Sequence, residues 1–408
     1  MEMLRFSTAG SVDDGKSTLI GRILYDSKTV FEDQLEAVAR SSARKGTHGI
    51  DLSLITDGLA AEREQKITID VAYRYFSTPK RKFIIADTPG HEQYTRNMVT
   101  GASTADLAII LVDARKGVLP QSKRHSYISA LLGIPHIVVA VNKMDLVDYS
   151  ETIFEQVKAD FIAFTKDLGI KDLSFIPVSA LNGDNIVNGS QHMPWFKAAP
   201  LLDFLETVQI DHRSSFAPLR FPVQCVIRPN LDFRGYAGQV ASGSLRVGDL
   251  LMALPSRKTS RVKAIVTFDG NLETAAAGDA VTIQLTDEID ISRGDMLVHA
   301  EQLPEIAQDV QAKVCWMVDE PLKAGKKYLL KHTTQTLTAL VLKVDSKLDI
   351  LNMQELPTTE LRLNEIGKIT LKLKRPIYCD AYAASRATGS FILIDELSNA
   401  TVGAGLLL

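Results

Sequence analysis

The sequence is poor in the features that mark secreted, membrane-bound and nucleic-acid-binding proteins. Its 408 residues contain three cysteines, Cys225, Cys315 and Cys379, which lie far apart and without metal-site spacing. We therefore expect reduced thiols and a cytoplasmic location. No apolar run reaches the roughly 18 residues that a membrane span needs, and the first residues lack the pattern of a signal peptide. The chain has 46 Lys and Arg and 49 Asp and Glu, which gives a net charge of −3. The charge of the chain as a whole therefore does not indicate nucleic-acid binding.

The features that are present change in character along the chain. Up to about Asp211, short apolar runs alternate with longer amphipathic stretches; the runs are 4–9, 83–86, 107–113, 137–141 and 175–178. This alternation of apolar runs and amphipathic stretches predicts a doubly wound, mostly parallel sheet with helices on both faces. From about His212, short β-branched runs separated by Gly, Pro, Asp and Asn predict antiparallel barrels. We expect an α/β domain over 1–211 and β-barrels over 212–306 and 307–408, with linkers at Asp211–Pro218 and Leu303–Asp309.

A phosphate-binding motif lies in the first turn. The run Gly10-Ser11-Val12-Asp13-Asp14-Gly15-Lys16-Ser17, followed by Thr18, fits G-x-x-x-x-G-K-[ST] between a predicted strand and a predicted helix over 16–25. The glycines let backbone N–H groups turn towards phosphate oxygens, and the helix N-terminus adds partial positive charge. Lys16 is expected to reach the β and γ phosphates, and the Ser17 hydroxyl is expected to ligate Mg²⁺. The α/β domain is thus predicted to be a P-loop domain.

Three further motifs follow later predicted strands. Asp87-Thr88-Pro89-Gly90 could hold Mg²⁺ through Asp87 and sense a γ-phosphate through Gly90, although such a run alone is usually a turn. In Asn142-Lys143-Met144-Asp145, the Asp145 carboxylate can accept hydrogen bonds from the N1–H and the exocyclic amine of guanine, a donor pair that adenine lacks. Ser179-Ala180-Leu181 would supply a backbone N–H for the guanine carbonyl. Together these motifs predict a guanine-nucleotide site at the strand ends, where doubly wound sheets bind ligands.

The four motifs and several longer stretches resemble a known family. "GSVDDGKST", "DTPGHEQYTRNM", "NKMDL" and "SAL" are similar to the translational GTPases of the elongation-factor superfamily. "DGLAAEREQKITIDVAYRYF", "RPNLDFRGYAGQVASG", "LTDEIDISRGDM" and "TGSFILIDELSNATVGAG" resemble the large, regulatory GTPase subunits of bacterial sulfate adenylyltransferase, over essentially the whole chain. The resemblance implies a P-loop GTPase domain followed by two β-barrels, with GTP and Mg²⁺ as ligands.

The resemblance also implies roles for two residues outside the strand-end motifs. Thr68 matches the switch threonine that closes over Mg²⁺ and the γ-phosphate, so it joins Ser17 and Asp87 as an expected metal residue. His91 matches the histidine that orients the attacking water. The chain departs from the family at Lys66, where members usually have glycine, so switch closure or the intrinsic hydrolysis rate could differ.

The resemblance implies a coupling function. In this family, GTP hydrolysis is linked to the formation of adenosine 5′-phosphosulfate (APS) from ATP and sulfate. That adenylyl transfer is catalysed by a separate, smaller subunit of the PP-loop type, so we expect a heterodimer or multiples of it, with no nucleic acid and no membrane as partners. The alternative is a translation factor that delivers an RNA to the ribosome. Such a carrier should have a basic groove shared by the GTPase and barrel domains.

Overall fold

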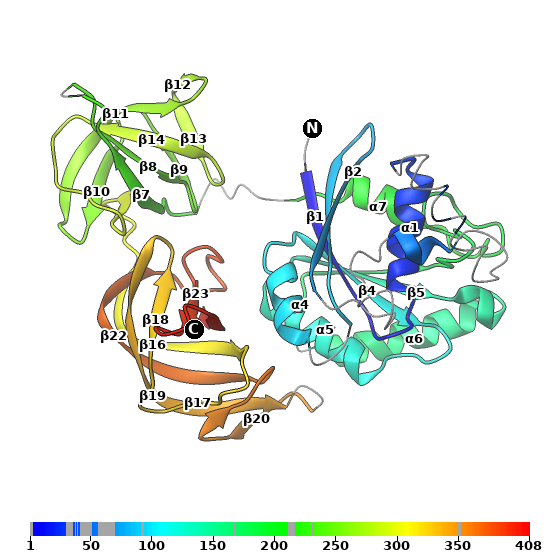
Figure 1. Ribbon diagram of the computed structural model, residues 1–408. Coiled ribbons are helices and arrows are strands. Elements are labelled where there is room, and N and C mark those ends of the chain that lie inside the picture. Colours follow the sequence, from blue (N-terminus) through cyan, green and yellow to red (C-terminus); the bar gives the residue numbers. More distant parts are fainter. Residues whose placement is uncertain are drawn as a thin grey trace. The chain divides into compact units, whose positions relative to one another are not determined.

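The computed structural model forms two compact units (Figure 1). The first is built from Met1–Ile210 and the second from Asp211–Asp349 and Met353–Leu408. The structure describes residues 3–29, 36, 38, 40, 51–55, 70–90, 94–166, 168–210, 217–230, 232–349 and 352–408. Among these residues, no helix combines the length and the apolar character that crossing a bilayer requires.

The first unit is an α/β layer structure around a six-stranded sheet. The sheet order is β2-β3-β1-β4-β5-β6, and every pair is parallel except β2 with β3. Its strands are β1 (Met3–Ala9), β2 (Ala72–Ser77), β3 (Lys82–Asp87), β4 (Leu107–Asp113), β5 (His136–Asn142) and β6 (Asp172–Pro177). Its helical segments are α1 (Lys16–Asp26), η1 (Leu52–Ile55), α4 (Thr95–Ala102), α5 (Pro120–Leu131), η3 (Met144–Val147), α6 (Glu151–Thr165) and α7 (Leu201–Thr207).

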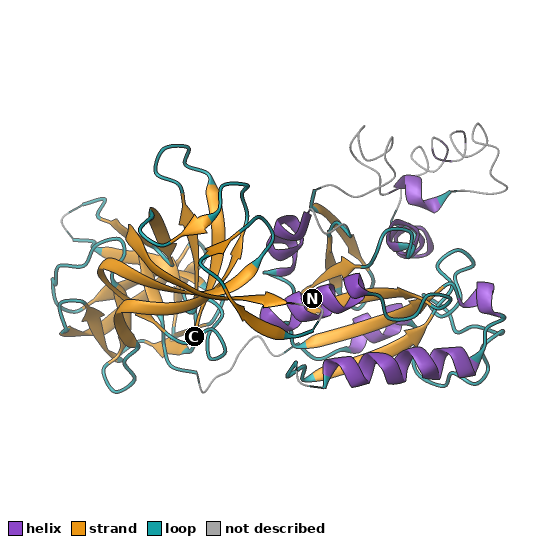
Figure 2. Ribbon diagram, turned by 90° about the horizontal axis from the view of Figure 1, so that it is seen from below, coloured by secondary structure: helices purple, strands orange, loops and turns teal. Residues whose placement is uncertain are grey.

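Helices cover both faces of this sheet because the strand side chains are apolar on both sides (Figure 2). In β4 all seven residues are buried. Ile109 and Leu111 pack into a core cluster with α1 and α7. Ile110 and Val112 point the other way and pack with α6. Successive strand residues alternate between faces, so a continuous apolar run is what a doubly covered parallel strand requires. The predicted doubly wound sheet is confirmed.

The second unit contains two closed β-barrels. In the first barrel, β10 also pairs with β11 and closes a sheet of order β10-β15-β7-β8-β14-β11-β12. In the second barrel, β18 also pairs with β19 and closes the order β18-β23-β24-β16-β22-β19-β20. The two predicted barrels are therefore present, each with its own apolar core.

The barrel strands have the following bounds. The first barrel and its short side sheet contain β7 (Phe221–Ile227), β8 (Gly235–Gln239), β9 (Ser244–Arg246), β10 (Leu250–Leu254), β11 (Lys258–Thr267), β12 (Gly270–Leu272), β13 (Thr274–Ala276), β14 (Ala280–Leu285) and β15 (Met296–His299). The second contains β16 (Glu305–Trp316), β17 (Leu322–Lys323), β18 (Lys327–His332), β19 (Gln335–Asp349), β20 (Gln354–Pro357), β21 (Glu360–Leu361), β22 (Ile366–Cys379), β23 (Ser390–Ile394) and β24 (Thr401–Leu407).

One predicted linker is wrong, and most of the other lies outside the described residues. Most of Leu303–Asp309 belongs to β16, which begins at Glu305 and pairs with β22. The register shifts between Ala307 and Asp309, and this irregularity breaks the alternation of exposed and buried residues that would have identified a strand. Most of the other predicted linker, Asp211–Pro218, falls within the residues that are not described.

An ion pair between the buried Arg220 and the partly buried Asp380 joins the two barrels of the second unit. Arg220, just before β7, donates from Nε and Nη2 to the two carboxylate oxygens of Asp380, both at 2.9 Å. The same guanidinium donates to the carbonyls of Leu219 and Gln302, and Asp380 also accepts a hydrogen bond from the Thr388 hydroxyl at 2.6 Å. Burial would raise the pKa of Asp380, but the hydrogen bonds from Arg220 and Thr388 outweigh it and lower the pKa.

We predict that Arg220→Met destabilises the second unit by about 1.5–3 kcal/mol, because the partly buried Asp380 carboxylate loses its counter-charge and two charged hydrogen bonds. The chain has two tryptophans, Trp195 in the first unit and the buried Trp316 in the second. Urea unfolding followed by Trp316 fluorescence in a Trp195→Phe background would measure the loss. The matched control is Arg362→Met, because Arg362 is 72% exposed beside Glu360 and should contribute little. Equal effects of the two substitutions would contradict the role of the Arg220–Asp380 pair.

Candidate functional site

Parallel pairing brings the four sequence motifs to one edge of the sheet. Thr8 of β1 lies opposite Asp87 of β3, and Asp113 of β4 lies opposite Asn142 of β5. The Gly10–Ser17 loop follows β1, and Ser179 comes directly after β6 and Val178. Because parallel strands end at the same edge, segments that are far apart in sequence become neighbours there. The predicted convergence at the carboxyl ends of the strands is therefore seen in the structure.

The loop between β1 and α1 is held in shape by its own backbone and by Asn142. Gly15 has a φ of 93°, and a Cβ there would lie 2.4 Å from the Asn142 Nδ2 atom, so this position needs glycine. The Ser11 N–H donates to the Asp14 carboxylate at 2.7 Å, and the Asn142 amide donates to the Asp14 carbonyl at 2.7 Å. Lys143 donates to the Asp13 carbonyl. These bonds connect the phosphate loop to the end of β5.

Lys16 is buried at the end of β3. Its ammonium lies 3.3 Å from a carboxylate oxygen of Asp87, and the exposed fractions of the two side chains are 8% and 3%. It also donates to the Thr88 carbonyl at 2.5 Å. The Thr88 hydroxyl in turn donates to the Thr8 carbonyl at 2.7 Å, which ties this turn back to β1. The arrangement places one buried cation between the phosphate loop and the carboxylate expected to hold Mg²⁺.

Gly90 packs directly against the phosphate loop. A Cβ at Gly90 would lie 2.2 Å from the Gly10 carbonyl oxygen, so any other residue would force the two segments apart. The Gly90 carbonyl accepts a hydrogen bond from the Gln121 side chain of α5 at 2.9 Å. The turn that follows β3 is thus fixed by backbone packing on one side and by a helix side chain on the other.

Asp145 is oriented by a hydroxyl from the last motif. The Ser179 hydroxyl donates to one Asp145 carboxylate oxygen at 2.6 Å, and Asn182 N–H donates to the same hydroxyl at 3.2 Å. The Ala180 N–H donates to the Asn142 side-chain carbonyl at 3.0 Å. Asn142, 2% exposed, therefore bonds both the phosphate loop and the Ser179–Leu181 segment. A planar base bound beside these groups would meet one carboxylate whose direction is already fixed.

The remaining predicted residues divide between exposed, buried and undescribed positions. Val12 and Leu181 are exposed, at 39% and 64%, whereas Met144 is fully buried in the core beside α6. Ser17 and Thr18 lie half-buried in the first turn of α1, and Pro89 is buried between Thr88 and Gly90. Thr68 and His91 lie outside the described residues. Their roles in metal binding and water orientation stay predictions.

Sequence reasoning missed three side chains that hold the site together. Arg22 of α1 donates to the carbonyls of Ala180 and Leu181, and Gln121 bonds Gly90 as described. Asp113 pairs with Lys143 at 3.0 Å. None belongs to a recognised motif, and their partners lie 30 to 159 residues away in sequence. Of the three, only Asp113 could have been noticed in the sequence, because it is a charged residue at the end of an otherwise apolar strand.

The oxygen donors at this edge suit Mg²⁺. A serine hydroxyl and a carboxylate are hard ligands of the kind that Mg²⁺ takes together with water and phosphate oxygens. Ser17 lies in the first turn of α1, which follows the phosphate loop, and Asp87 ends β3 beside Lys16. Among the described residues, His, Cys, Asp and Glu side chains form no cluster of three or more that could hold a metal by themselves. A metal here would depend on the nucleotide and on water for its other ligands.

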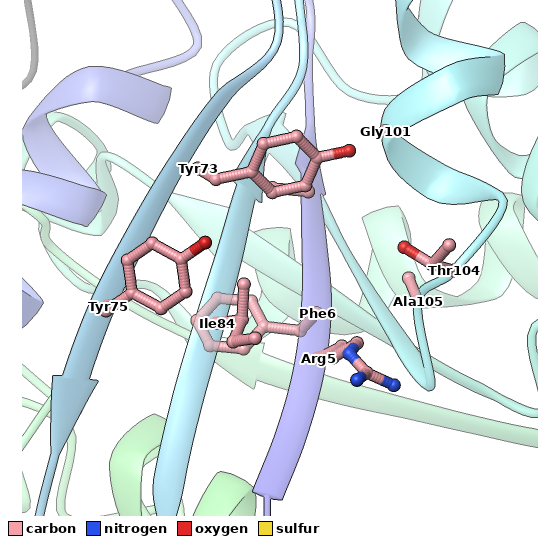
Figure 3. A pocket seen from close by; sticks show the side chains of 9 residues that line it. Arg5, Phe6, Tyr73, Tyr75, Ile84, Gly101, Thr104 and Ala105 are labelled. Atoms are coloured by element: carbon pink, nitrogen blue, oxygen red, sulfur yellow. The ribbon is translucent and has the colours of Figure 1, made fainter. Parts of the chain in front are cut away.

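A separate hollow lies on the sheet near β2 (Figure 3). Its volume is about 210 Å³, and Tyr73 and Tyr75 of β2, Ile84 of β3, and Arg5 and Phe6 of β1 line it with neighbours at the end of α4. Figure 3 shows the two tyrosine rings side by side along β2, with Arg5 lower on β1. None of the predicted site residues lines this hollow. The hollow is mostly apolar and is distinct from the sheet edge where the four motifs meet.

Comparison with known proteins gives matches along the whole chain. The family described as elongation factor Tu GTP binding domain matches residues 1–213, and the GTP-eEF1A C-terminal domain-like family matches residues 309–408. Sulfate adenylyltransferase subunit 1 of Alteromonas mediterranea is 56% identical over 409 residues, which cover 100% of this chain and 87% of that protein. The same subunit of Cellvibrio japonicus is 57% identical, covering 100% and 86%. Bifunctional enzyme CysN/CysC of Rhodopirellula baltica is 57% identical, covering 100% and 64%.

The buried Asp14 carboxylate makes the stability of the first unit depend on pH. The side chain is 1% exposed, and burial raises the pKa of Asp14 to about 6, although the Ser11 N–H opposes this rise. The folded chain therefore binds more protons than the unfolded chain between about pH 4 and pH 6. Because the ionised form is the costly one, stability falls as pH rises through that range, and the full cost of about 3 kcal/mol applies above it.

We expect Asp14→Asn, without nucleotide, to stabilise the first unit by up to about 3 kcal/mol at pH 7.5, since the amide oxygen can still accept from Ser11. The gain should shrink below pH 6 and vanish near pH 4. Urea unfolding followed by the helical circular dichroism signal, which comes from the first unit in the described part of the chain, would test this. Asp160→Asn on the exposed side of α6 is the control. A pH-independent gain would show that the burial of charge is not the cause.

Proposed function

Because this chain belongs to the sulfate adenylyltransferase subunit 1 family and carries an elongation factor Tu GTP binding domain, we propose that it is the GTP-hydrolysing regulatory subunit of sulfate adenylyltransferase. It couples GTP hydrolysis to the formation of APS from ATP and sulfate by a separate catalytic subunit. The observation that carries the proposal is identity of 56–57% with subunit 1 proteins over the entire chain. The sheet edge at the carboxyl ends of the strands supports the proposal, because the groups that a guanine nucleotide would need lie together there.

Residues at the end of β5 and in the turn after β6 recognise the guanine base. Asp145 accepts the N1–H and the exocyclic amine of guanine, and the Ser179 hydroxyl at 2.6 Å keeps the carboxylate in place for this. Asn142 keeps the phosphate loop and the Ser179–Leu181 segment at a fixed distance. A backbone N–H of that segment meets the guanine carbonyl. The groups are oriented before the nucleotide arrives, so little ordering remains to oppose binding.

The phosphates bind along Gly10–Thr18 and the first turn of α1. Backbone N–H groups and the helix N-terminus face the phosphate oxygens, and Lys16 exchanges its pairing with Asp87 for the β and γ phosphates. This exchange leaves Asp87 to hold Mg²⁺ together with Ser17 and Thr68. When bound, Mg²⁺ neutralises charge that builds on the phosphate oxygens. His91 orients the attacking water. The Gly90 N–H donates to the γ-phosphate, so the turn that Gln121 holds senses whether this phosphate is present.

The partner is proposed to be the smaller, PP-loop-type catalytic subunit, in a heterodimer or multiples of it. The relatives' name, subunit 1, supports a partner subunit as such. The translation-factor alternative is less supported, because the full-length relatives carry the sulfate adenylyltransferase name. A cytoplasmic location fits the three cysteines, which are free thiols.

We predict that Asp145→Asn shifts binding from GTP towards xanthosine triphosphate. The amide presents donors where guanine also presents donors, and such a mismatch costs on the order of 1–3 kcal/mol. The C2 oxygen of xanthine accepts from the amide instead. Calorimetric titration with both nucleotides measures the shift. Asp148→Asn is the matched control, because it makes the same change three residues away at an exposed, left-handed position that asparagine tolerates. Unchanged GTP affinity in the Asp145 variant would remove this residue from base recognition.

The coupling is tested by assaying each subunit alone and both together, with and without GTP. We expect slow GTP hydrolysis and no adenylyl transfer by this chain alone. The catalytic subunit should accelerate GTP hydrolysis, and GTP should raise APS formation. A ligand shifts an equilibrium only through unequal affinity for its states, so the partner should prefer one nucleotide form by about 5- to 150-fold. APS made by this chain alone, or APS formation by the pair that ignores GTP, would contradict the proposal.

A further inference from the structure

A buried carboxylate at the end of β4 belongs to none of the motifs. The Asp113 side chain is fully buried, and its Oδ2 atom lies 3.0 Å from the Lys143 ammonium. Arg115 binds both carboxylate oxygens, from Nε to Oδ1 at 3.0 Å and from Nη2 to Oδ2 at 2.7 Å, and its backbone N–H donates to Oδ1 at 3.0 Å. Burial alone would raise the pKa of Asp113, but hydrogen bonds from Arg115 and Lys143 outweigh it and hold the pKa far below its usual range. The carboxylate is therefore a permanent negative charge.

Lys143 is fixed at both ends of its side chain. Its backbone has a φ of 64°, in the left-handed region that lysine rarely adopts, and the preceding Asn142 is paired with Asp113 in the sheet. Its ammonium contacts Asp113 and donates to the Asp13 carbonyl of the phosphate loop. The four-carbon stem is thus stretched from the end of β5 to the loop, and its side chain is 21% exposed. An unrestrained lysine at a surface would instead sample many rotamers.

We propose that Asp113 is a positioning residue for the nucleotide, which holds the Lys143 stem in the orientation that covers the face of the guanine ring. The inference rests on the proposed function, because it concerns the same guanine site. Asp113 itself touches no ligand in this role. It removes rotamer freedom from Lys143 before binding, and it also keeps the lysine attached to the phosphate loop, so that base and phosphate contacts form together.

The expected cost of losing Asp113 follows from the ordering of one side chain. In Asp113→Asn the ammonium loses its counter-charge, so the stem must be ordered when the nucleotide binds. We expect GTP and GDP affinities to fall by roughly three- to tenfold, because immobilising one long side chain costs on that order. Lys143→Met should also weaken binding. If Asp113 acts through Lys143, the double variant should bind GTP as Lys143→Met does, since neighbours in one network are not additive.

The test is calorimetric GTP and GDP titration of the parent, Asp113→Asn, Lys143→Met and the double variant, with circular dichroism to verify folding. A merely structural role of Asp113 would give losses that add to those of Lys143→Met. One further variant serves as the control. Asp172→Asn removes a carboxylate, paired with His136 at 2.7 Å, from the opposite edge of the same sheet, and should change nothing.

Two results would overturn the inference while leaving the proposed function intact: GTP binding by a folded Asp113→Asn chain that equals the parent, or additive losses in the double variant. A parent chain that binds no guanine nucleotide would overturn both the proposed function and the role of Asp113. The parent titration therefore separates the two failures.

Discussion

Parallel pairing of β1, β3, β4, β5 and β6 is the constraint on which the site depends. Each strand contributes a polar end to the same edge while its length is buried between two layers of helices. A shift of register would separate Thr8 from Asp87 or Asp113 from Asn142, and the hydrogen bonds across the edge would not form. The apolar strands therefore provide both the stability of the first unit and the alignment of its chemistry. Because the core fixes the edge, motifs more than a hundred residues apart act as one surface.

The sequence predicted the elements with strong local signals and missed those that depend on distant partners. The strand over 107–113 and the start of the helix at Lys16 agree with the structure because continuous apolar runs and the phosphate-loop spacing are local features. The first-barrel strand β8 (Gly235–Gln239) contains two glycines, Gly235 and Gly238. Both glycines are needed because a Cβ would collide with Thr282 at Gly235 and with the Pro222 carbonyl at Gly238. Close packing between strands cannot be read from one strand alone.

For the site, composition and spacing predicted which residues converge, but not how they are held. The roles of Arg22 and Asp113 arise only when the sheet brings their partners within hydrogen-bond distance. Ser179 was expected to contribute backbone, whereas its hydroxyl also bonds Asp145. The family expectation is confirmed by the full-length relatives. The roles of Thr68 and His91 stay predictions, since both lie outside the residues that the structure describes.

Barrel closure has a consequence for how this chain behaves in concentrated solution. A strand whose ladder is unpaired can recruit another chain, and closing a sheet on itself removes that opportunity. In the described part of the chain, the pairings of β10 with β11 and of β18 with β19 confine the unpaired ladders of the large barrel sheets to the short strands β12 and β20. In the α/β sheet, β2 and β6 are the terminal strands, and β2 carries the exposed Tyr73 and Tyr75. Self-association through strand addition, if a preparation shows it, should therefore start at β2 rather than at the barrels.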